Sequence, residues 1–505
     1  MKHSNEFKFD DLQGLLRFGH GQLSETCFLL LNIVDANAAK QWLSNARVTS
    51  AIETTPRPQT ALHIAFSVAG LRAIGLQEAL IEGFSDEFIT GMTGDESRSR
   101  RLGDIGVNAP AYWEWGGDSQ QVPHVLLLLY AESNGIAAWR KQVEDKLFTA
   151  AFQLISQLPT QDMGKREPFG FADGISQPNI DWANRQSTDT HQRAEYSNWL
   201  APGEIVLGYP NEYKQYTVRP LIDPQTDALA AVLPIAEDQP ALKDFARNGS
   251  YLVLRQLDQD VPGFWQFLNK ATDGAPEQLA AAMVGRQLND APLMPTGVEK
   301  IPGVPVEDQL NQFNYVPDPR GNVCPIGAHI RRANPRTGDL PAGVTGLWTR
   351  LIRILGFGLK HPNDDLVASS RFHRLLRRGR TYGPPLSPAD ASKPDAPIAE
   401  RGLQFICLVA NISRQFEFVQ NAWLVNSKFA GLQNERDPLL AHRHPLNDGT
   451  STDRFQRPDP SGPVRETCHL PQFISVRGGA YFFMPGLSAL KYLASLPSTG
   501  RGHSA

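Results

Sequence analysis

The stretch FLLLNIVDANAAKQW, residues 28–42, joins an apolar run typical of a buried strand to a short polar break and a helical stretch that carries a tryptophan. The arrangement recurs in VLLLLYAESNGIAAW (125–139) and YLVLRQLDQDVPGFW (251–265), and in a longer form in FICLVANISRQFEFVQNAW (405–423). In the first three copies, the tryptophan follows the first residue by the same distance, because 42 − 28, 139 − 125 and 265 − 251 all equal 14. This spacing predicts a repeated supersecondary unit, with chance similarity in a generic α+β protein as the alternative.

Further strand candidates lie between the repeated units, at ALHIAFSV (61–68) and GGAYFFMPG (478–486). Paired strand–helix–strand units predict an α+β fold with two ferredoxin-like domains, each with an antiparallel sheet, in a dimeric α+β barrel-like arrangement. The connection APGEIVLGYPNEYKQYTVRPLIDPQTD (201–227) is rich in proline, glycine and turn residues, which favours a boundary after it. We therefore expect domains over 1–235 and 236–505.

Composition restricts the function classes. With 41% hydrophobic residues and a formal charge of −4, the 505-residue chain can bury a large core and lacks the basic bias of a nucleic-acid binder. Four widely spaced cysteines, with no CxxC pair, argue against a zinc site or a disulfide scaffold and suit a reducing compartment. No secretory start and no apolar run of roughly 20 residues is found, so we expect a cytoplasmic location and no membrane span.

A single carboxylate, Asp173, lies between Gly170 and Gly174 in EPFGFADGISQP (167–178), a run otherwise apolar or weakly polar. Desolvating a lone carboxylate costs free energy unless a cation or several donors meet it. The two glycines allow backbone angles and close approaches that other residues forbid. The segment therefore predicts a group that comes close to Asp173.

Three further segments offer candidate site residues. His329 lies in CPIGAHIRRANPR (324–336), where a small apolar approach suits a metal-bound imidazole and the arginines suit anions; a buried structural histidine is the alternative. The arginines of FHRLLRRGRTYG (372–383) could equally be a solvated helix end. In GLQFICLV (402–409), Leu403 and Phe405 share one face and, taken alone, are core residues.

Together these segments resemble the dye-decolorising peroxidase family, most closely its longer bacterial and fungal members. DDLQGLLRFG (10–19) is similar to the family's N-terminal motif, and GFADG (170–174) matches its G-x-x-D-G signature. AHIRRANPR resembles the segment with the haem-binding histidine, LLRRGRTYG the segment with the distal arginine, and VRGGAYFFMPG (476–486) the closing strand. The five segments occur in the family's order along nearly the whole chain.

The resemblance implies a haem peroxidase with one haem b per chain, held mainly in the C-terminal half. His329 matches the iron ligand, and Asp173 and Arg377 match the distal pair. Asp437, in ERDPLL (435–440), matches the acceptor of the second nitrogen of His329, with Glu435 and Asn411 as competitors. Other expected cofactor contacts are Gly174, Ile175, Ser176, Arg331, Leu403 and Phe405.

The resemblance also implies the reactants, namely hydrogen peroxide and an organic reductant such as a dye or a phenol. Trp423 matches a tryptophan that relays electrons to the surface in fungal relatives, so it is a candidate surface oxidation site; core packing is the alternative. A haem-binding or haem-delivery protein with incidental peroxidase activity is a rival hypothesis, and a scaffold without cofactor is a third. The complete set Asp173, Arg377 and His329 favours the enzyme. Monomer and homodimer both stay open.

One departure from the compact family members is the distance of 377 − 329 = 48 residues between His329 and Arg377. The intervening TGLWTRLIRILGFGLKHPNDD (345–365) has apolar positions at helical spacing with basic residues between them. We expect a docked surface helix there, with a haem shield, a subunit contact or a membrane-surface contact as alternatives.

Overall fold

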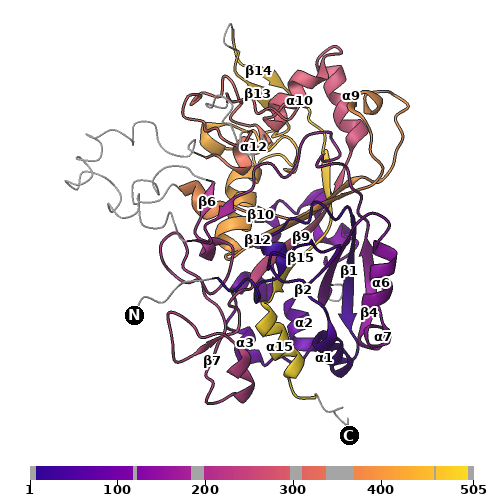
Figure 1. Ribbon diagram of the computed structural model, residues 1–505. Coiled ribbons are helices and arrows are strands. Elements are labelled where there is room, and N and C mark those ends of the chain that lie inside the picture. Colours follow the sequence, from indigo (N-terminus) through magenta and orange to yellow (C-terminus); the bar gives the residue numbers. More distant parts are fainter. Residues whose placement is uncertain are drawn as a thin grey trace, which may run out of the picture.

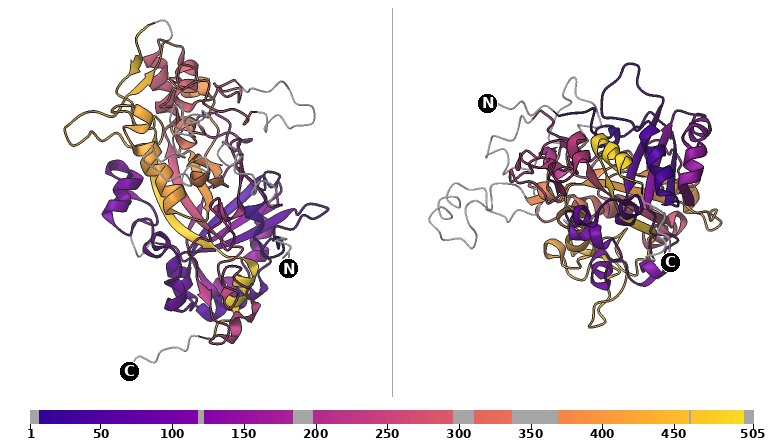
Figure 2. Two further views of the ribbon diagram at one scale, coloured as in Figure 1. Left: turned by 90° about the vertical axis from the view of Figure 1, so that its left-hand side faces the viewer. Right: turned by 90° about the horizontal axis from the view of Figure 1, so that it is seen from below.

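A computed structural model of the protein describes residues 7–117, 122–183, 198–295, 310–336, 369–459 and 462–498. Its main strands are β1 (Glu25–Ile33), β2 (Thr60–Phe66), β3 (Val125–Ala131), β4 (Phe152–Leu158), β9 (Ser250–Gln259), β10 (Leu376–Arg377), β11 (Arg380–Tyr382), β12 (Gly402–Val409) and β15 (Ile474–Met484). They form one antiparallel sheet in the order β10-β12-β9-β15-β2-β3-β1-β4, with β11 paired to β12. Figures 1 and 2 show this sheet from three sides.

Each half of the sheet has the ferredoxin-like strand order. The first half reads β4-β1-β3-β2, with α1 (Ala36–Asn45) after β1 and α6 (Ile136–Val143) after β3. The second half reads β10-β12-β9-β15, with α9 (Val261–Ala271) after β9 and the π-helical turns η8 (Ser413–Glu417) and η9 (Val419–Val425) after β12. These four strand–helix pairs are the four units of the sequence. The predicted α+β fold with two ferredoxin-like halves is confirmed.

The tryptophans of the first three units occupy similar positions in the fold. Trp42, Trp139 and Trp265 are buried, and each indole Nε1–H donates to a backbone carbonyl: those of Val143, Ala61 and Phe169 respectively. The tryptophan therefore packs its helix against the neighbouring structure and satisfies its own polar atom there.

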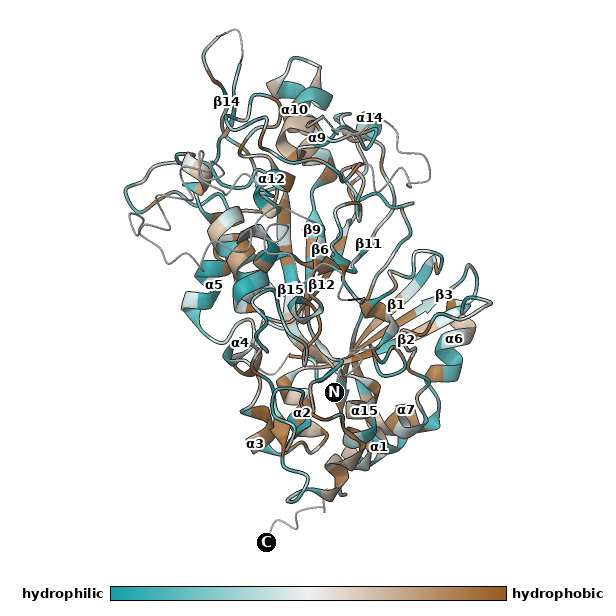
Figure 3. Cartoon of the chain, turned by 60° about the vertical axis from the view of Figure 1, so that its left-hand side comes forward, coloured by the Kyte–Doolittle hydropathy of each residue, from teal (hydrophilic) through white to brown (hydrophobic). Residues whose placement is uncertain are grey.

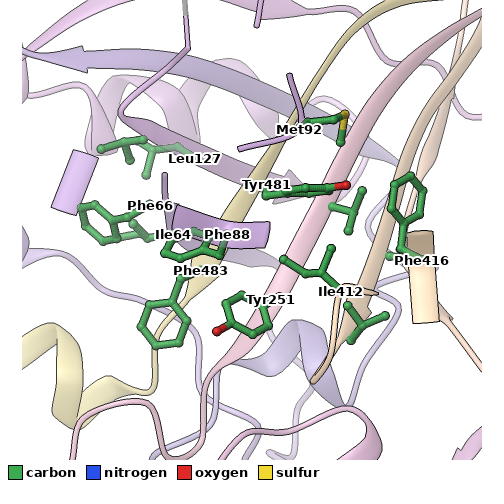
Figure 4. Close-up of a cluster of buried hydrophobic side chains, with 14 of the residues drawn as sticks. Ile64, Phe66, Phe88, Met92, Leu127, Tyr251, Ile412, Phe416, Tyr481 and Phe483 are labelled. Atoms are coloured by element: carbon green, nitrogen blue, oxygen red, sulfur yellow. The ribbon is translucent and has the colours of Figure 1, made fainter. Parts of the chain in front are cut away.

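The two halves meet where β15 pairs with β2, at the register Phe483 opposite Phe66. Figure 4 shows the apolar cluster at this junction, to which both halves contribute, with Ile64 and Leu127 from the first and Tyr251 and Tyr481 from the second. Burial of this continuous apolar surface stabilises the junction. The strands of the sheet are mostly apolar, whereas the outer helices carry polar surface (Figure 3).

The described strands do not close into a barrel, in contrast to the barrel-like expectation. The ladder ends at β4 on one side and at β10 and β11 on the other. Beyond β4, the chain approaches the opposite edge, where the Gln161 N–H donates to the Thr381 carbonyl over 2.7 Å. The last helix, α15 (Leu487–Ser495), packs against α1 of the first half (Figure 1). The boundary between 235 and 236 stays a prediction.

The other elements are short. The remaining helices are α2 (Val68–Ala73), α3 (Glu78–Ile81), α4 (Asp86–Thr90), α5 (Glu96–Leu102), α7 (Lys146–Ala151), α10 (Pro276–Val284), α12 (His329–Ala333) and α14 (Pro388–Ala391). Two-residue or three-residue strands form the pairs β5 (Asn179–Ile180) with β6 (Trp199–Leu200), β7 (Leu221–Ile222) with β8 (Lys243–Asp244), and β13 (Phe455–Arg457) with β14 (Arg465–Thr467). Within the described ranges, no helix combines the length and apolar character needed to cross a bilayer.

Candidate functional site

A cavity of about 250 Å³ lies against one face of the second half of the sheet. Its sheet wall uses every second residue of the strands, as the alternation of side chains requires: Arg377 of β10; Leu403 and Phe405 of β12; Arg255, Leu257 and Gln259 of β9; Ile474 and Val476 of β15. The helical wall comes from α12 and from η9, through Val419, Gln420 and Leu424. The loop 167–176 and residues 102–108 of the first half also contribute, as do Arg286, Arg336, Arg374 and residues 439–442.

Asp173 and Arg377, 204 residues apart in sequence, meet at this cavity. Arg377 Nη1 donates to Asp173 Oδ1 over 2.8 Å, and the Gly174 N–H donates to the same oxygen over 2.7 Å. The Arg377 N–H donates in turn to Gln177 Oε1 over 3.0 Å. Asp173 thus has both a cation and a backbone donor. These two contacts offset the free-energy cost of removing its carboxylate from water.

The glycines beside Asp173 have the backbone that their positions require. Gly170 has φ 102° and Gly174 has φ 86°, in the left-handed region that favours glycine. The two side chains of the ion pair retain accessible surface, 31% for Asp173 and 33% for Arg377, and both line the cavity. The turn therefore presents the carboxylate to the cavity while it is held by the arginine.

His329 begins α12 and also lines the cavity, with 30% of its side chain accessible. Its Nδ1 lies 2.9 Å from Oδ2 of Asp437, a fully buried carboxylate. The other oxygen of Asp437, Oδ1, accepts the N–H groups of Leu439 (3.0 Å) and Leu440 (2.8 Å). The two competitors bond elsewhere: Asn411 Oδ1 accepts from the Arg414 N–H and Glu435 Oε2 from the Gln456 N–H.

Electrostatics in this pair favour an ionised carboxylate. Burial opposes the charge of Asp437, but the attraction of His329 and its hydrogen bond outweigh burial and lower the Asp437 pKa. Burial likewise opposes an imidazolium, yet Asp437 raises the pKa of His329. An ionised Asp437 can only accept, so Nδ1 of His329 carries the proton and Nε2 is the nitrogen with a lone pair for a metal.

The residues present fit a haem. The imidazole of His329 on the helical wall could hold the iron, and Leu403, Phe405, Val419 and Leu424 give apolar faces to the cavity. A surplus of positive charge lines the same space, from Arg286, Arg336, Arg374 and Arg377. Burial and the neighbouring Arg336 lower the pKa of Arg286 to about 10. Such a cationic lining suits a ligand that carries carboxylates.

Most of the other candidate residues also reach the cavity. Ile175, Ser176, Leu403 and Phe405 line it. Gly174 is not part of the lining, although its N–H donates to Asp173.

Arg331, in contrast, lies outside the lining, and its expected contact with the cofactor stays a prediction. It is buried, donates to Asp318 Oδ2, to the Asp318 carbonyl and to the Cys324 carbonyl, and stacks over Tyr315. Two residues along a helix turn by about 200°, so Arg331 faces away from His329. Sequence reasoning passed over Arg286, Arg336 and Arg374, although the last two stand in the quoted segments.

Trp423 lies largely in the protein interior. Its side chain is 7% exposed, and its role as a surface oxidation site stays a prediction. It packs edge-on against His373, with ring centroids 5.1 Å apart, and against Phe418 at 5.4 Å. These contacts are consistent with the alternative of core packing. The expectations for 345–365 fall outside the described residues.

Comparisons with known proteins agree with one family. No protein-family model matches the chain. The chain is 28% identical over 511 residues to a dye-decolorizing peroxidase of Mycetinis scorodonius, which covers 96% of this chain and 87% of that protein. It is 29% identical over 451 residues to the multifunctional dye peroxidase of an Amycolatopsis species, covering 84% and 81%.

A solved structure is similar over the same extent. The crystal structure of a fungal DyP-type peroxidase from Auricularia auricula-judae matches with a TM-score of 0.69 and 25% identity, over 97% of this chain and 99% of that one. The similarity in sequence and fold extends along nearly the whole chain, and it agrees with the arrangement of residues in the cavity. The proteins that this chain resembles over nearly its whole length are dye-decolorising peroxidases.

Proposed function

We propose that the protein is a haem-dependent dye-decolorising peroxidase, which reduces hydrogen peroxide and oxidises dyes, phenols or other organic reductants. The observation that carries the proposal is that one cavity is lined by Asp173, which pairs with Arg377 at 2.8 Å, and by His329, whose Nδ1 lies 2.9 Å from the fully buried Asp437 outside the lining. The names of the relatives support the same activity. Haem storage or delivery requires only His329 and Asp437. It gives no role to the pair of Asp173 and Arg377, which the enzyme does.

We propose one haem b per chain, with His329 Nε2 as the iron ligand. Arg286, Arg336 and Arg374 are the cations suited to its carboxylates. When bound, the haem supplies the redox chemistry by which peroxide is reduced and an organic molecule is oxidised. Asp437 holds the Nδ1 proton of His329, which fixes the ring orientation and makes Nε2 more basic.

The distal pair handles the protons and charge of peroxide. Oδ1 of Asp173 is occupied by Arg377 and Gly174, whereas Oδ2 has no hydrogen bond to the described residues. Oδ2 is therefore the atom that would take a proton from one peroxide oxygen and return it to the other, a role worth roughly 10²–10⁴-fold. The Arg377 guanidinium would stabilise negative charge on the oxygen that departs.

Leu403 and Phe405 would restrict this part of the cavity to molecules about the size of peroxide. Both side chains are apolar, and they point to the same face of β12 because the residues are two apart in the strand. They lie on the same wall of the cavity as Arg377. Bulky reductants would then be oxidised outside it. Monomer or homodimer, and a cytoplasmic location, stay predictions.

The experiment that tests the proposal is a comparison of peroxide-dependent dye oxidation by the haem-loaded protein with that by the same concentration of free haem. We expect the protein to turn over far faster, and its absorption spectrum to show histidine-ligated haem. Turnover no faster than free haem would favour haem binding or delivery. A purified protein that takes up no haem would contradict both.

A further inference from the structure

The loop that carries Asp173 is built around a second carboxyl group, Glu167. Oε1 of Glu167 accepts the Phe171 N–H over 2.9 Å, and Oε2 accepts the Phe169 N–H over 3.0 Å. The Glu167 N–H donates to the Phe171 carbonyl, and the Glu167 carbonyl accepts from the Gly170 N–H. Glu167 therefore closes the turn over 167–171 from which Asp173 projects.

Glu167 is also tied to the sheet. Its Oε2 accepts from Nε2 of Gln259, on β9, over 2.9 Å, and both residues line the cavity together with Asp173. The charged groups that act on it are Asp173 from the same loop and His329 from α12. The adjacent Arg166 turns away, toward the carbonyls of Gly170 and Leu288 and toward Asp290. Glu167 thus has hydrogen-bond donors but no ion-pair partner among the described residues.

This setting favours the neutral acid. Burial raises the pKa of Glu167 to about 7; the hydrogen bonds from Gln259, Phe169 and Phe171 oppose the rise, and the charge of Asp173 adds to it. Asp173, in contrast, is paired with a guanidinium. Two carboxyl groups in one cavity with environments that differ in this way commonly divide the acid and base roles between them.

Gln259 can accommodate either form of Glu167. Its Nε2 donates to Glu167, while its Oε1 is buried and has no hydrogen-bond partner among the described residues. An amide turned by half a rotation would place that oxygen where it accepts from a protonated Glu167, and the two orientations differ little in shape. The loop can therefore keep its attachment to β9 whether or not Glu167 carries a proton.

We propose that Glu167 is a positioning residue that holds a proton in the cavity under mildly acidic conditions and so keeps a second negative charge away from Asp173. The inference rests on the proposed function, because it concerns the step in which peroxide loses its proton to Asp173. That step moves negative charge from Asp173 onto peroxide, and we infer that an ionised Glu167 in the same cavity disfavours the peroxide anion. Ionisation of Glu167 should therefore slow the reaction.

The test is the pH dependence of the reaction of the haem-loaded protein with hydrogen peroxide, measured by stopped flow. We expect the parent rate to fall by roughly tenfold as the pH rises through about 7, equivalent to about 1.4 kcal/mol. Glu167→Gln, whose amide is neutral at all pH, should keep the rate of the acidic side and lose this fall. The matched control is Glu204→Gln, since burial also raises the pKa of Glu204 to about 7 but Glu204 does not line the cavity; its profile should match the parent.

A second variant and a second readout separate this role from simple support of the loop. Gln259→Leu removes a donor to the ionised acid, so the midpoint should move to higher pH. Infrared difference spectra of the haem-loaded protein across pH 7 should show protonated carboxyl absorption, of which Glu167→Gln removes one component and Glu204→Gln a different one.

Persistence of the fall in Glu167→Gln, or an unmoved midpoint in Gln259→Leu, would overturn the inference. So would equal loss of rate at all pH in Glu167→Gln together with faster hydrogen exchange at the amides of Phe169 and Phe171, which would make Glu167 a purely structural residue. A parent protein that binds haem but does not react with peroxide at any pH would instead overturn the proposed function.

Discussion

His329 illustrates how a single residue acquires a role from its partner. The imidazole has two nitrogens, and Asp437 engages one of them at 2.9 Å from a fully buried position. Because Asp437 is held by the N–H groups of Leu439 and Leu440, its position does not depend on the cofactor. The remaining nitrogen is therefore oriented in advance for a metal.

The first prediction is that His329→Ala abolishes or strongly weakens the haem absorption of the purified protein, since the variant lacks the imidazole that Asp437 orients for the iron. The matched control is His442→Ala. His442 lines the same cavity, but its Nδ1 already accepts from Arg436, and burial lowers its pKa to about 3. We expect this control to retain ligated haem. Full occupancy with an unchanged spectrum in His329→Ala would refute the ligand assignment.

The second prediction concerns the distal pair. Asp173→Asn removes the proton acceptor, so we expect its reaction with peroxide to be slower by roughly 10²–10⁴-fold, as for other general bases. Arg377→Ala removes the cation at 2.8 Å and should also slow the reaction, while both variants keep haem bound through His329. Stopped-flow measurement of the peroxide step, with haem content as the control, tests both. Parent rates in the two variants would rule out the assigned roles.

At the scale of the element, the helix after β12 differs from its three counterparts. It is π-helical over Ser413–Glu417 and Val419–Val425, and it forms part of the cavity wall through Val419, Gln420 and Leu424. A π-helical turn inserts a residue and rotates the following side chains, and such turns often accompany functional sites. The fourth sequence unit, in which the tryptophan comes later than in the other three, is the unit with the π-helical turns.

The third prediction follows from the burial of Trp423 on that element. Trp423→Phe should lower the free energy of unfolding by about 1–3 kcal/mol, because the smaller ring leaves space beside His373 and Phe418. It should not selectively lower turnover of a bulky dye, since a side chain 7% exposed cannot contact one. Thermal unfolding and parallel assays with a small phenol and an anthraquinone dye measure this. Trp199→Phe, at a tryptophan 40% exposed, is the stability control; selective loss with the bulky dye in Trp423→Phe would restore the relay hypothesis.

At the scale of the whole molecule, several buried carboxyl groups make stability depend on pH. Burial raises the pKa values of Glu167, Glu204 and Glu435 from 4.5 to about 7. A group whose pKa is higher in the folded chain binds its proton more tightly there. Its contribution to stability is full below pH 4.5 and is lost as the pH rises to about 7.

The fourth prediction is that the free energy of unfolding falls between about pH 4.5 and about pH 7, and that Glu204→Gln makes this fall smaller. A shift from 4.5 to about 7 corresponds to a contribution on the order of 3 kcal/mol for one group. Denaturant titrations at a series of pH values measure the slope. Glu96→Gln, on the exposed face of α5, should leave the slope unchanged. An identical slope in Glu204→Gln and the parent would contradict the prediction.

The sequence by itself determined the four strand–helix units and hence the α+β class, because strand runs and the helical tryptophans are local patterns set by periodicity. The sequence also identified the segments that meet at the cavity. The glycines beside Asp173 and the basic residues near His329 and Arg377 can be recognised without knowledge of the fold. Only the fold shows that Asp437, and not Asn411 or Glu435, is the partner of His329. All three are polar side chains that follow His329 in the chain, and the sequence does not show which of them lies beside it.

Only the tertiary structure decided which way individual side chains face. Arg331 and Arg336 stand in one short segment, yet Arg331 bonds to Asp318 and Arg336 lines the cavity. Trp423 is buried because η9 packs against His373 and Phe418, and β15 joins the halves through a single register with β2. Side-chain direction and the meeting of distant segments depend on the packing of the entire chain, since each buried face must find another apolar surface and each buried polar atom a partner.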